Sequence, residues 1–597
     1  MSINALMDER FERTGDAPLL ERRTNAGDTW EVVSANAFRA EVLAVAAGLM
    51  ARGVNTDDRI AILSRTRYEW TLLDFALWSI GAVGVPVYET SSTSQIQWIL
   101  SDSGATTAIV ETAHHASLVE EARTELPLLH ATWIIEDGLV EALKTDGVDI
   151  PEQDVITRRN AVHGSDLATI IYTSGSTGRP KGAELTHFNF AYVAQNAALA
   201  IPDMFLAEGA RTILFLPLAH VLARVIQTTV LASNTVLGHV PNVKTLVADM
   251  QSFRPTFLLA VPRVFEKVYN TAEAKASTSK IRRSLFYWAV RSTIAYSRDL
   301  DLPRVPFPAR VRHGIANRLV LSKLRDAMGG NVTMAISGGA PLGERLGHFY
   351  RGMGVLVLDG YGLTETTAPA AVCMPETFAV ASVGPAIPGT TIRLADDGEV
   401  LVNGPHVFRG YHNDPVRTQE VLQDGWFHTG DIGSIDDEGR LTITGRKKEI
   451  IVTAGGKNVA PAILEDRLRS HPLISQVVVV GDAQPFIGAL VTLDPDMLPG
   501  WLATKGLPEM SVEEARENPQ VLASLQRAVD RANRVMARAE SIRKFTVLPI
   551  DFTEANGYLT PSLKVKKLEV KRDFAAEIAE LYGTTTSVTA PSGAVTA

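Results

Sequence analysis

The sequence has little cysteine: Cys373 is the single one among 597 residues, so no disulfide can form within the chain. This composition fits a reducing compartment, and we predict a cytoplasmic location. Cys373 is either a nucleophile or a small buried side chain, and the buried state is the commoner one for a free cysteine.

Long apolar runs are also missing. The longest, residues 75–88, spans 14 residues and contains two glycines and a proline. A bilayer span needs about 20 residues, so we expect a buried helix leading into a turn and no integral membrane segment. The first residues lack a basic stretch followed by an apolar one, so no signal peptide is expected. No basic amphipathic helix stands out, which leaves transient membrane contact as the only membrane role considered.

An excess of positive charge is absent as well, since the formal net charge is −9. Nucleic acid is therefore not an expected partner. The composition, 46% hydrophobic and 21% charged, is typical of a globular protein, and the length predicts two or more domains. Nothing in the sequence indicates an oligomeric state.

Strand-like and helix-like runs alternate along the first part of the chain, which predicts an α/β fold. Short strands with glycine turns follow from about residue 390 and indicate a small antiparallel unit. We predict an N-terminal domain at 1–445, a smaller α+β domain at 446–583 with one helical stretch over 512–540, and a disordered tail at 584–597. Expected strands include residues 59–63, 108–110, 132–135, 212–215, 257–260, 332–337, 398–403, 439–444, 477–481 and 489–493.

The strongest local pattern is a loop that follows the β-like run 170–172. It offers backbone N–H groups, hydroxyls and one cation together, which is the chemistry that holds polyphosphate. Pro180 rules out a Walker A loop, and a flexible surface turn remains the alternative. The loop residues are Thr173, Ser174, Gly175, Ser176, Thr177, Gly178 and Lys181.

A second pattern follows the β-like run 355–358. Its glycines would let a flat ligand approach the backbone. Glu365 stands where a dinucleotide-binding loop has its third glycine, and it is either a ligand of Mg²⁺ or an ordinary surface side chain. The residues are Asp359, Gly360, Tyr361, Gly362, Thr364 and Glu365.

Three later segments carry charged residues beside turns. Asp431, in 425–431, is suited to accept both hydroxyls of a ribose, or is a plain turn residue. Residues 445–449 contain Arg446 and Lys448. Residues 556–567 place Lys564 in a basic cluster, for which a solvated lysine run is the alternative.

In their order and spacing these five segments resemble the AMP-forming acyl-CoA synthetases, within the acyl-, aryl-CoA and peptide-synthetase adenylating superfamily. The resemblance covers residues 5–583. Residues 216–220 and 261–267 look like the long-chain fatty-acid branch of this family.

The resemblance implies a set of roles. The loop 173–181 would cradle the phosphates of ATP, while Thr173 and Glu365 would hold Mg²⁺. The adenine would lie between Asp359–Tyr361 and a second segment, and Asp431 would bind the ribose with Arg446 nearby. That second segment is Gly339, Ala340 and Pro341.

The resemblance also implies two successive reactions. Lys564 would be the catalytic lysine for acyl-adenylate formation. The smaller domain would then rotate about Lys448 and bring the loop with Gly455 and Gly456 to a tunnel for coenzyme A.

The substrate class follows from a missing carboxylate. Residues 216–224 contain no Asp or Glu, whereas amino-acid-activating relatives place an Asp near the position of His220, so an α-amino substrate is disfavoured. The apolar runs 225–237 and 257–264 line an acyl channel or form core. His220 is either a gate at the tunnel mouth or a core or phosphate-proximal histidine. Ala223 and Leu563 depart from residues common in relatives, which are Glu and Gly respectively.

The predicted activity is a long-chain fatty acid–CoA ligase that uses ATP, Mg²⁺ and coenzyme A. One alternative is a fatty acyl-AMP ligase that hands the acyl group to a carrier protein. The other is a non-catalytic nucleotide- or lipid-binding protein on the same fold.

Overall fold

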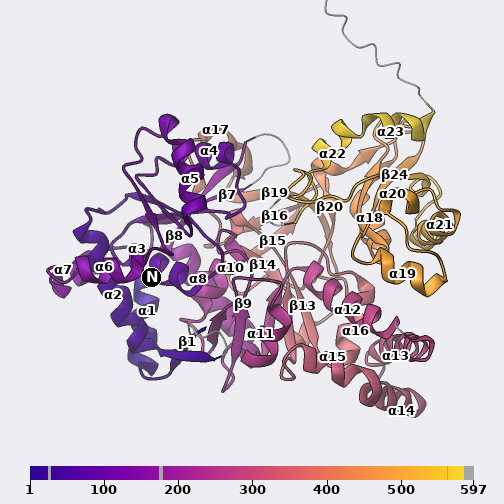
Figure 1. The fold of residues 1–597 in the computed structure, drawn as a ribbon, viewed down its shortest axis with the longest axis horizontal. Coiled ribbons are helices and arrows are strands. Elements are labelled where there is room, and N and C mark those ends of the chain that lie inside the picture. The colour runs from indigo at the N-terminus through magenta and orange to yellow at the C-terminus, as the bar shows by residue number, and fades with distance from the viewer. Residues whose placement is uncertain (24–28, 174–178, 278, 535, 561–562, 584–597) are drawn as a thin grey trace, which may run out of the picture. The chain divides into compact units, whose positions relative to one another are not determined.

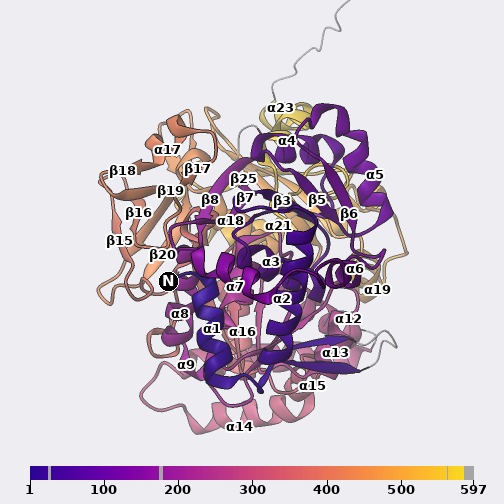
Figure 2. The ribbon, with the colours of Figure 1, turned by 90° about the vertical axis from the view of Figure 1, so that its left-hand side faces the viewer.

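The computed structural model describes residues 1–23, 29–173, 179–277, 279–534, 536–560 and 563–583. The predicted tail, 584–597, lies outside these residues. The chain divides into two compact units, Met1–Ile443 and Thr444–Ala597, drawn in Figures 1 and 2. The first is a large α/β unit and the second a small α+β unit, so the predicted fold class is confirmed.

A seven-stranded sheet forms the first part of the larger unit, in the order β17-β8-β7-β4-β3-β5-β6. The strands β3 to β7 run parallel, while β8 and β17 are antiparallel to their neighbours. The strands are β3 (Arg59–Leu63), β4 (Val83–Val87), β5 (Thr107–Val110), β6 (Ala131–Ile134), β7 (Leu167–Thr173), β8 (Lys181–Thr186) and β17 (Gly410–Tyr411).

The apolar run 75–88 contributes to this sheet. It begins inside helix α3 (Tyr68–Ser79), of which every residue but Glu69 is buried, turns at Gly81 with a φ of +74°, and continues as β4. A helix that is apolar all round belongs in a core. The expected helix and turn are therefore present, and the run also supplies a strand.

Two four-stranded sheets follow, in the orders β2-β1-β10-β9 and β11-β12-β13-β14. Strands β11, β12 and β13 are parallel and in register, so Ala260 and Ser337, which end β11 and β12, lie beside Asp359 within β13. The strands are β1 (Pro18–Arg23), β2 (Trp30–Ser34), β9 (Arg211–Leu214), β10 (Val236–His239), β11 (Phe257–Ala260), β12 (Met334–Ser337), β13 (Leu356–Leu363) and β14 (Ala368–Val372).

The predicted antiparallel unit is a sheet in the order β15-β16-β19-β18, with β20 beside β19. Its strands are β15 (Thr391–Leu394), β16 (Glu399–Asn403), β18 (Leu422–Gln423), β19 (Trp426–Ile435) and β20 (Leu441–Arg446).

Helices pack around these sheets, and local sequence sets many of their ends. Helix α4 begins at Ser92, whose side chain forms a capping box with Gln95, and ends at Gly104 with a φ of +68°. The helices are α1 (Ile3–Thr14), α2 (Ala35–Ala51), α3, α4 (Thr93–Ser103), α5 (Ala113–Glu121), α6 (Leu139–Asp146), α7 (Glu152–Ala161), α8 (His187–Ala200), α9 (Pro202–Phe205), α10 (Val221–Thr229), α11 (Leu246–Phe253), α12 (Pro262–Ser277), α13 (Lys280–Asp299), α14 (Phe307–Ala316), α15 (Ser322–Ala327), α16 (Glu344–Met353) and α17 (Pro415–Val421).

The smaller unit contains a three-stranded sheet, β23-β24-β25, and a hairpin, β21-β22. The expected single helix over 512–540 is wrong. Asn518 caps a new helix that starts at Pro519, and this helix ends at Asn533. The elements are β21 (Ile451–Val452), β22 (Asn458–Val459), α18 (Pro461–Arg469), β23 (Ile474–Val480), β24 (Ile487–Leu493), α19 (Leu498–Lys505), α20 (Val512–Ala515), α21 (Pro519–Asn533), β25 (Ile542–Val547), α22 (Lys567–Asp573) and α23 (Ala575–Tyr582).

Two expectations concern single features of the chain. Cys373 is 1% exposed, and burial raises the pKa of its thiol to about 11, so it is the buried side chain of the two alternatives. Within the described ranges, no helix combines the length and apolar character needed to cross a bilayer.

Candidate active site

The predicted phosphate loop connects two antiparallel strands. Thr173, the last residue of β7, pairs with Lys181, the first residue of β8. Ser174, Gly175, Ser176, Thr177 and Gly178 lie outside the described residues. Strand β8 follows at Lys181, so no helix N-terminus stands directly after the loop, and the predicted phosphate binding would depend on the loop's own N–H groups, hydroxyls and lysine.

Helix α4 fixes both sides of this loop. The Trp98 indole N–H donates to the Pro180 carbonyl at 2.9 Å, and the Arg179 guanidinium lies 4.7 Å from the Trp98 ring. The Tyr172 hydroxyl donates to Asp102 at 2.6 Å, and burial together with this carboxylate raises the pKa of Tyr172. The strand ends that carry the loop are therefore held in place.

Tyr411 joins two of the predicted site residues. The Lys181 ammonium lies 5.0 Å from the centre of the Tyr411 ring, and the Tyr411 hydroxyl donates to Glu365 Oε1 at 2.7 Å. Glu365 is 9% exposed. Lys181 of the predicted phosphate loop thus lies beside the Tyr411 ring, and Glu365, the predicted metal ligand, accepts from the Tyr411 hydroxyl.

The position of Tyr411 follows from strand pairing. Strand β17 lies beside β8, with Tyr411 opposite Ala183. His412 Nδ1 lies 2.7 Å from Glu184 Oε1, and this hydrogen bond is the main cause of the lowered pKa of Glu184. A side chain 230 positions after Lys181 in the sequence is therefore fixed beside it.

A second hydrogen bond joins two more predicted residues. The Tyr361 hydroxyl donates to Asp431 Oδ2 at 2.8 Å, and both side chains are buried, with 8% and 5% exposure. The Asp431 backbone N–H donates to the Thr429 hydroxyl at 3.0 Å. The Tyr361 hydroxyl thus orients the carboxylate that is predicted to bind a ribose.

The segment between Tyr361 and Glu365 begins as a strand. Strand β13 continues through Asp359, Gly360 and Gly362 to Leu363, and Thr364 then begins a single 3₁₀ turn. A side chain at Gly362 would collide with the Ala368 carbonyl, which explains this glycine. The second pattern is thus the end of strand β13 followed by a turn that contains Glu365.

Backbone strain follows directly after Glu365. Thr367 and Ala368 have φ values of +50° and +69°, in the left-handed region that a β-branched residue rarely adopts. The Thr367 hydroxyl donates to the His406 carbonyl at 2.8 Å, and the Thr366 hydroxyl donates to the Ala368 carbonyl at 2.9 Å. These bonds hold a strained turn that orients Glu365.

The segments predicted to enclose adenine lie at one sheet edge. Gly339, Ala340 and Pro341 lie just after the end of β12 and are exposed. On the neighbouring strand β13, Gly360 follows Asp359, which pairs with the last residue of β12. Leu222 from α10 and Val261 from the end of β11 lie against Gly338 and Gly339, respectively. An apolar surface therefore adjoins the exposed glycine segment.

Helix α10 begins beside this edge at His220. His220 is partly exposed and caps the helix, with its Nδ1 accepting from the Leu222 N–H at 3.3 Å. Most of the apolar runs 225–237 and 257–264 pack in the main core, whereas Val261, and Leu222 just before the first run, are partly exposed. Partial exposure argues against a fully buried core position for His220, and its role as a gate or as a phosphate-proximal histidine stays a prediction.

A buried ion pair holds α10 against the seven-stranded sheet. Arg224 donates to Asp74 of α3 at 2.5 Å and to the Thr169 hydroxyl of β7 at 2.5 Å, while Gln227 donates to Asp74 at 2.9 Å. Asp74 and Arg224 side chains are 1% and 0% exposed. Burial raises the pKa of Asp74 and lowers that of Arg224, so each charge depends on the other.

The smaller unit carries the remaining predicted residues. Arg446 and Lys448 are exposed at its start, and Gly455 and Gly456 are exposed in the turn between β21 and β22. Lys564 is exposed, and its backbone pairs with Thr560 through the Lys564 carbonyl at 2.8 Å. Leu563 has a φ of +61°, a conformation that glycine adopts freely, which explains why glycine suits this position.

The lysines of the basic cluster are not equivalent. Lys567 contacts Glu449 and Glu465 at 2.7 and 2.8 Å. Burial alone would lower the pKa of Lys567, but these two carboxylates outweigh it and raise the pKa. Lys567 is thus engaged within the unit and less exposed than Lys564.

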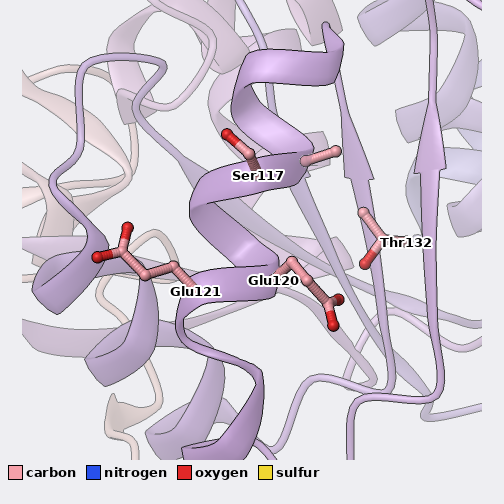
Figure 3. A pocket seen from close by; sticks show the side chains of 5 residues that line it. Ser117, Glu120, Glu121 and Thr132 are labelled. Atoms are coloured by element: carbon pink, nitrogen blue, oxygen red, sulfur yellow. The ribbon is translucent and has the colours of Figure 1, made fainter.

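A surface hollow elsewhere has no chemistry in common with these residues. It is lined by Ala116, Ser117, Glu120, Glu121 and Thr132 on α5 and β6 (Figure 3). Its two carboxylates would repel an anionic nucleotide or fatty acid. It is therefore not a candidate for the substrate site.

Tyr411 is the residue that sequence reasoning missed. No local pattern marks it, because its role depends on the pairing of β17 with β8. Within the first unit, Lys181 and Glu365 both contact Tyr411, and Tyr361 contacts Asp431. The roles themselves remain predictions at this point.

Comparison with known proteins places the chain in a family. Residues 7–412 match the model of the AMP-binding enzyme family, and residues 448–586 match that of the AMP-binding enzyme C-terminal domain. The chain is 46% identical to long-chain-fatty-acid–CoA ligase FadD15 of Mycobacterium tuberculosis, over 96% of each chain. It is 33% identical to long-chain-fatty-acid–CoA ligase 6 of Mus musculus, over 95% of this chain and 85% of the relative.

Solved structures share the fold. A Mycobacterium tuberculosis fatty acyl CoA synthetase superimposes with a TM-score of 0.62 at 23% identity, over 96% of this chain and 99% of the other. The adenylation domain of a Mycobacterium chelonae carboxylate reductase gives 0.73 at 22% identity, over 98% and 91%. The predicted resemblance is confirmed, and the chain belongs to the AMP-binding enzyme family.

Proposed function

We propose that the protein is a fatty acid–CoA ligase that converts ATP, a long-chain fatty acid and coenzyme A into acyl-CoA, AMP and diphosphate. The geometric observation that most supports an adenylating site is the meeting of Lys181 and Glu365 on Tyr411. The similarity to long-chain-fatty-acid–CoA ligases along nearly the whole chain supports the substrate class.

ATP binding uses residues of the first unit, together with Arg446 of the second. The loop from Thr173 to Lys181 holds the phosphates, and Asp431, oriented by Tyr361, accepts the ribose hydroxyls. The adenine lies against the exposed segment at Gly339 and the end of β13. Arg446 adds a positive charge near the nucleotide.

Magnesium fits the donor set at Glu365. Mg²⁺ prefers oxygen ligands and is commonly held by one or two carboxylates together with substrate phosphates. No cluster of three or more His, Cys, Asp or Glu side chains suited to a metal occurs in the part of the chain that the structure describes, so the phosphates of ATP would complete the site. Thr173 supplies a hydroxyl, and Mg²⁺ would neutralise charge on the phosphate oxygens.

The first reaction exchanges one bond at the α-phosphorus of ATP. A carboxylate oxygen of the fatty acid attacks the α-phosphorus, the bond to the β-phosphate oxygen breaks, and diphosphate leaves. Negative charge spreads over the phosphoryl oxygens in the transition state, and Lys564 of the smaller domain stabilises it. Lys181 holds the leaving diphosphate.

The second reaction transfers the acyl group. The coenzyme A thiol attacks the acyl carbon, its proton is released, and AMP leaves with the former carboxylate oxygen. We propose that residues 446–583 form a mobile domain that turns about Lys448 between the two reactions. This exchange replaces Lys564 by the turn with Gly455 and Gly456, which would line the path of the pantetheine arm.

Two features support a fatty acid as the acyl substrate. Residues 216–224 lack a carboxylate for an α-amino group. Leu222 and Val261 form an apolar surface beside the nucleotide segment, with His220 at its edge.

The proposal is tested by product analysis with fatty acids of graded length, with and without coenzyme A. Acyl-CoA, AMP and diphosphate should form together when ATP, Mg²⁺, a long-chain acid and coenzyme A are all present. Diphosphate release that stops at a bound acyl-adenylate despite coenzyme A would indicate the fatty acyl-AMP ligase. Nucleotide binding without diphosphate release, with any acid, would indicate the non-catalytic binding protein.

A further inference from the structure

Helix α14 presents an unusual outer face. Phe307, Val311, Ile315 and Leu319 recur every fourth residue through α14 and the turn that follows it, and are 73%, 45%, 48% and 44% exposed. Residues at this spacing lie on one side of a helix. They form a continuous apolar stripe in water, which we name the α14 stripe.

The opposite face of α14 is firmly packed. Ala309 and Ala316 are buried, and the His313 ring stacks on Tyr296 of α13 at 3.8 Å. His313 Nε2 also lies 2.7 Å from the Gly352 carbonyl at the end of α16. Both views draw α14 along the rim of the first unit, beside α13 (Figures 1 and 2). The stripe is thus the outward side of a fixed helix.

The segment is strongly basic, although the chain carries a net charge of −9. Residues 302–325 contain no Asp or Glu. Four arginines of this segment have no ion pair within 4.0 Å in the described ranges, namely Arg304, Arg310, Arg312 and Arg318. Arg310 and Arg312 lie on either side of the stripe and are exposed. The basic residues are Arg304, Arg310, Arg312, Arg318, Arg325 and Lys323.

We propose that the α14 stripe docks the protein on an anionic lipid surface. An apolar stripe flanked by arginines is the pattern of a helix that lies in a membrane interface, with its apolar side among the acyl chains and its cations at the headgroups. The sequence analysis did not single out this helix. The signal was missed because Pro306 and Pro308 interrupt the pattern at its start.

Charge distinguishes a lipid surface from a second copy of the chain. A two-fold contact through the same face would set Arg310 and Arg312 of one copy against the same cations of the other. Anionic headgroups instead complement these cations. The acidic remainder of the chain would be repelled, so this face is the one that approaches the lipid.

The test is co-sedimentation of the full-length protein with phosphatidylcholine vesicles that contain or lack about one third phosphatidylglycerol, without ATP, fatty acid or coenzyme A. We expect binding to the anionic vesicles that weakens at high salt. Replacing Arg310 and Arg312 together by Gln should lower the partition coefficient about 30-fold. Phe307→Ser with Ile315→Ser should lower it to the level of neutral vesicles.

Val148→Ser is the matched control, because Val148 is 78% exposed on another surface of the same unit and should leave binding unchanged. Equal binding to both vesicle types, or binding unaffected by the α14 substitutions, would overturn the proposal. A concentration-dependent dimer that the same substitutions abolish, without vesicle binding, would assign the stripe to a second copy instead. Since the assay contains no substrate, its result is independent of the proposed reaction.

Discussion

Removing one charge of the Asp74–Arg224 pair should destabilise the first unit strongly. Asp74→Asn keeps the shape of the side chain and one oxygen that can accept from Arg224, but it leaves the guanidinium, 0% exposed, in the core without a counter-charge. Breaking a buried ion pair from one side typically costs about 3–5 kcal/mol. With a urea m value of about 3 kcal/mol/M for a unit of this size, the midpoint should fall by about 1 M or more.

Tryptophan fluorescence suits this measurement, because seven of the eight tryptophans lie in the first unit. Glu31→Gln is the control, since it removes a 3.1 Å pair with Arg22 in which Glu31 is 52% exposed, and should change stability by about 0–1 kcal/mol. The double variant Asp74→Leu with Arg224→Met should recover most of the loss, because neither charge then remains in the core. Equal, small shifts for Asp74→Asn and Glu31→Gln would refute this account of the pair.

Three further predictions concern the site and the core. Tyr411→Phe removes the hydrogen bond to Glu365 and keeps the ring beside Lys181. Diphosphate release at saturating ATP should therefore slow by about 10-fold. An unchanged rate would mean that this hydrogen bond does not orient Glu365. Lys564→Ala should abolish adenylate formation yet spare thioester formation from supplied acyl-adenylate, and equal loss in both would count against a mobile domain. Burial lowers the pKa of His187 from 6.5 to about 4. Below pH 6.5 the unfolded chain therefore binds a proton that the native state does not bind, and the free energy of unfolding falls as the pH drops from 6.5. His187→Phe should remove about 2 kcal/mol of the stability difference between pH 6.5 and 5, whereas an unaltered pH dependence in denaturant titrations would show that this ring is not the cause.

Much of the α/β architecture could be predicted because strands and buried helices carry strong local patterns. The predicted bounds of strands β3 and β11 are the observed ones. The helix over 512–540 was wrong because alternating charge continues across Asn518 and Pro519, where capping and the proline ring end one helix and begin another.

The candidate site was predicted where residues that act together are close in sequence. The glycines and Glu365 of the second pattern are an example, although their strand conformation was not foreseen. Tyr411 was missed because its place beside Lys181 depends on long-range strand pairing, and the Asp74–Arg224 pair because it joins α3 to α10. Such contacts leave no periodic or local signal.

The central claim, that the acyl group passes through an acyl-adenylate, is tested most directly with a long-chain fatty acid labelled with ¹⁸O in its carboxylate. Attack of a carboxylate oxygen on the α-phosphorus, followed by thiol attack on the acyl carbon, predicts one ¹⁸O in the AMP and none in the diphosphate for every acyl-CoA formed. AMP without the label, or label in diphosphate or inorganic phosphate, would contradict the account.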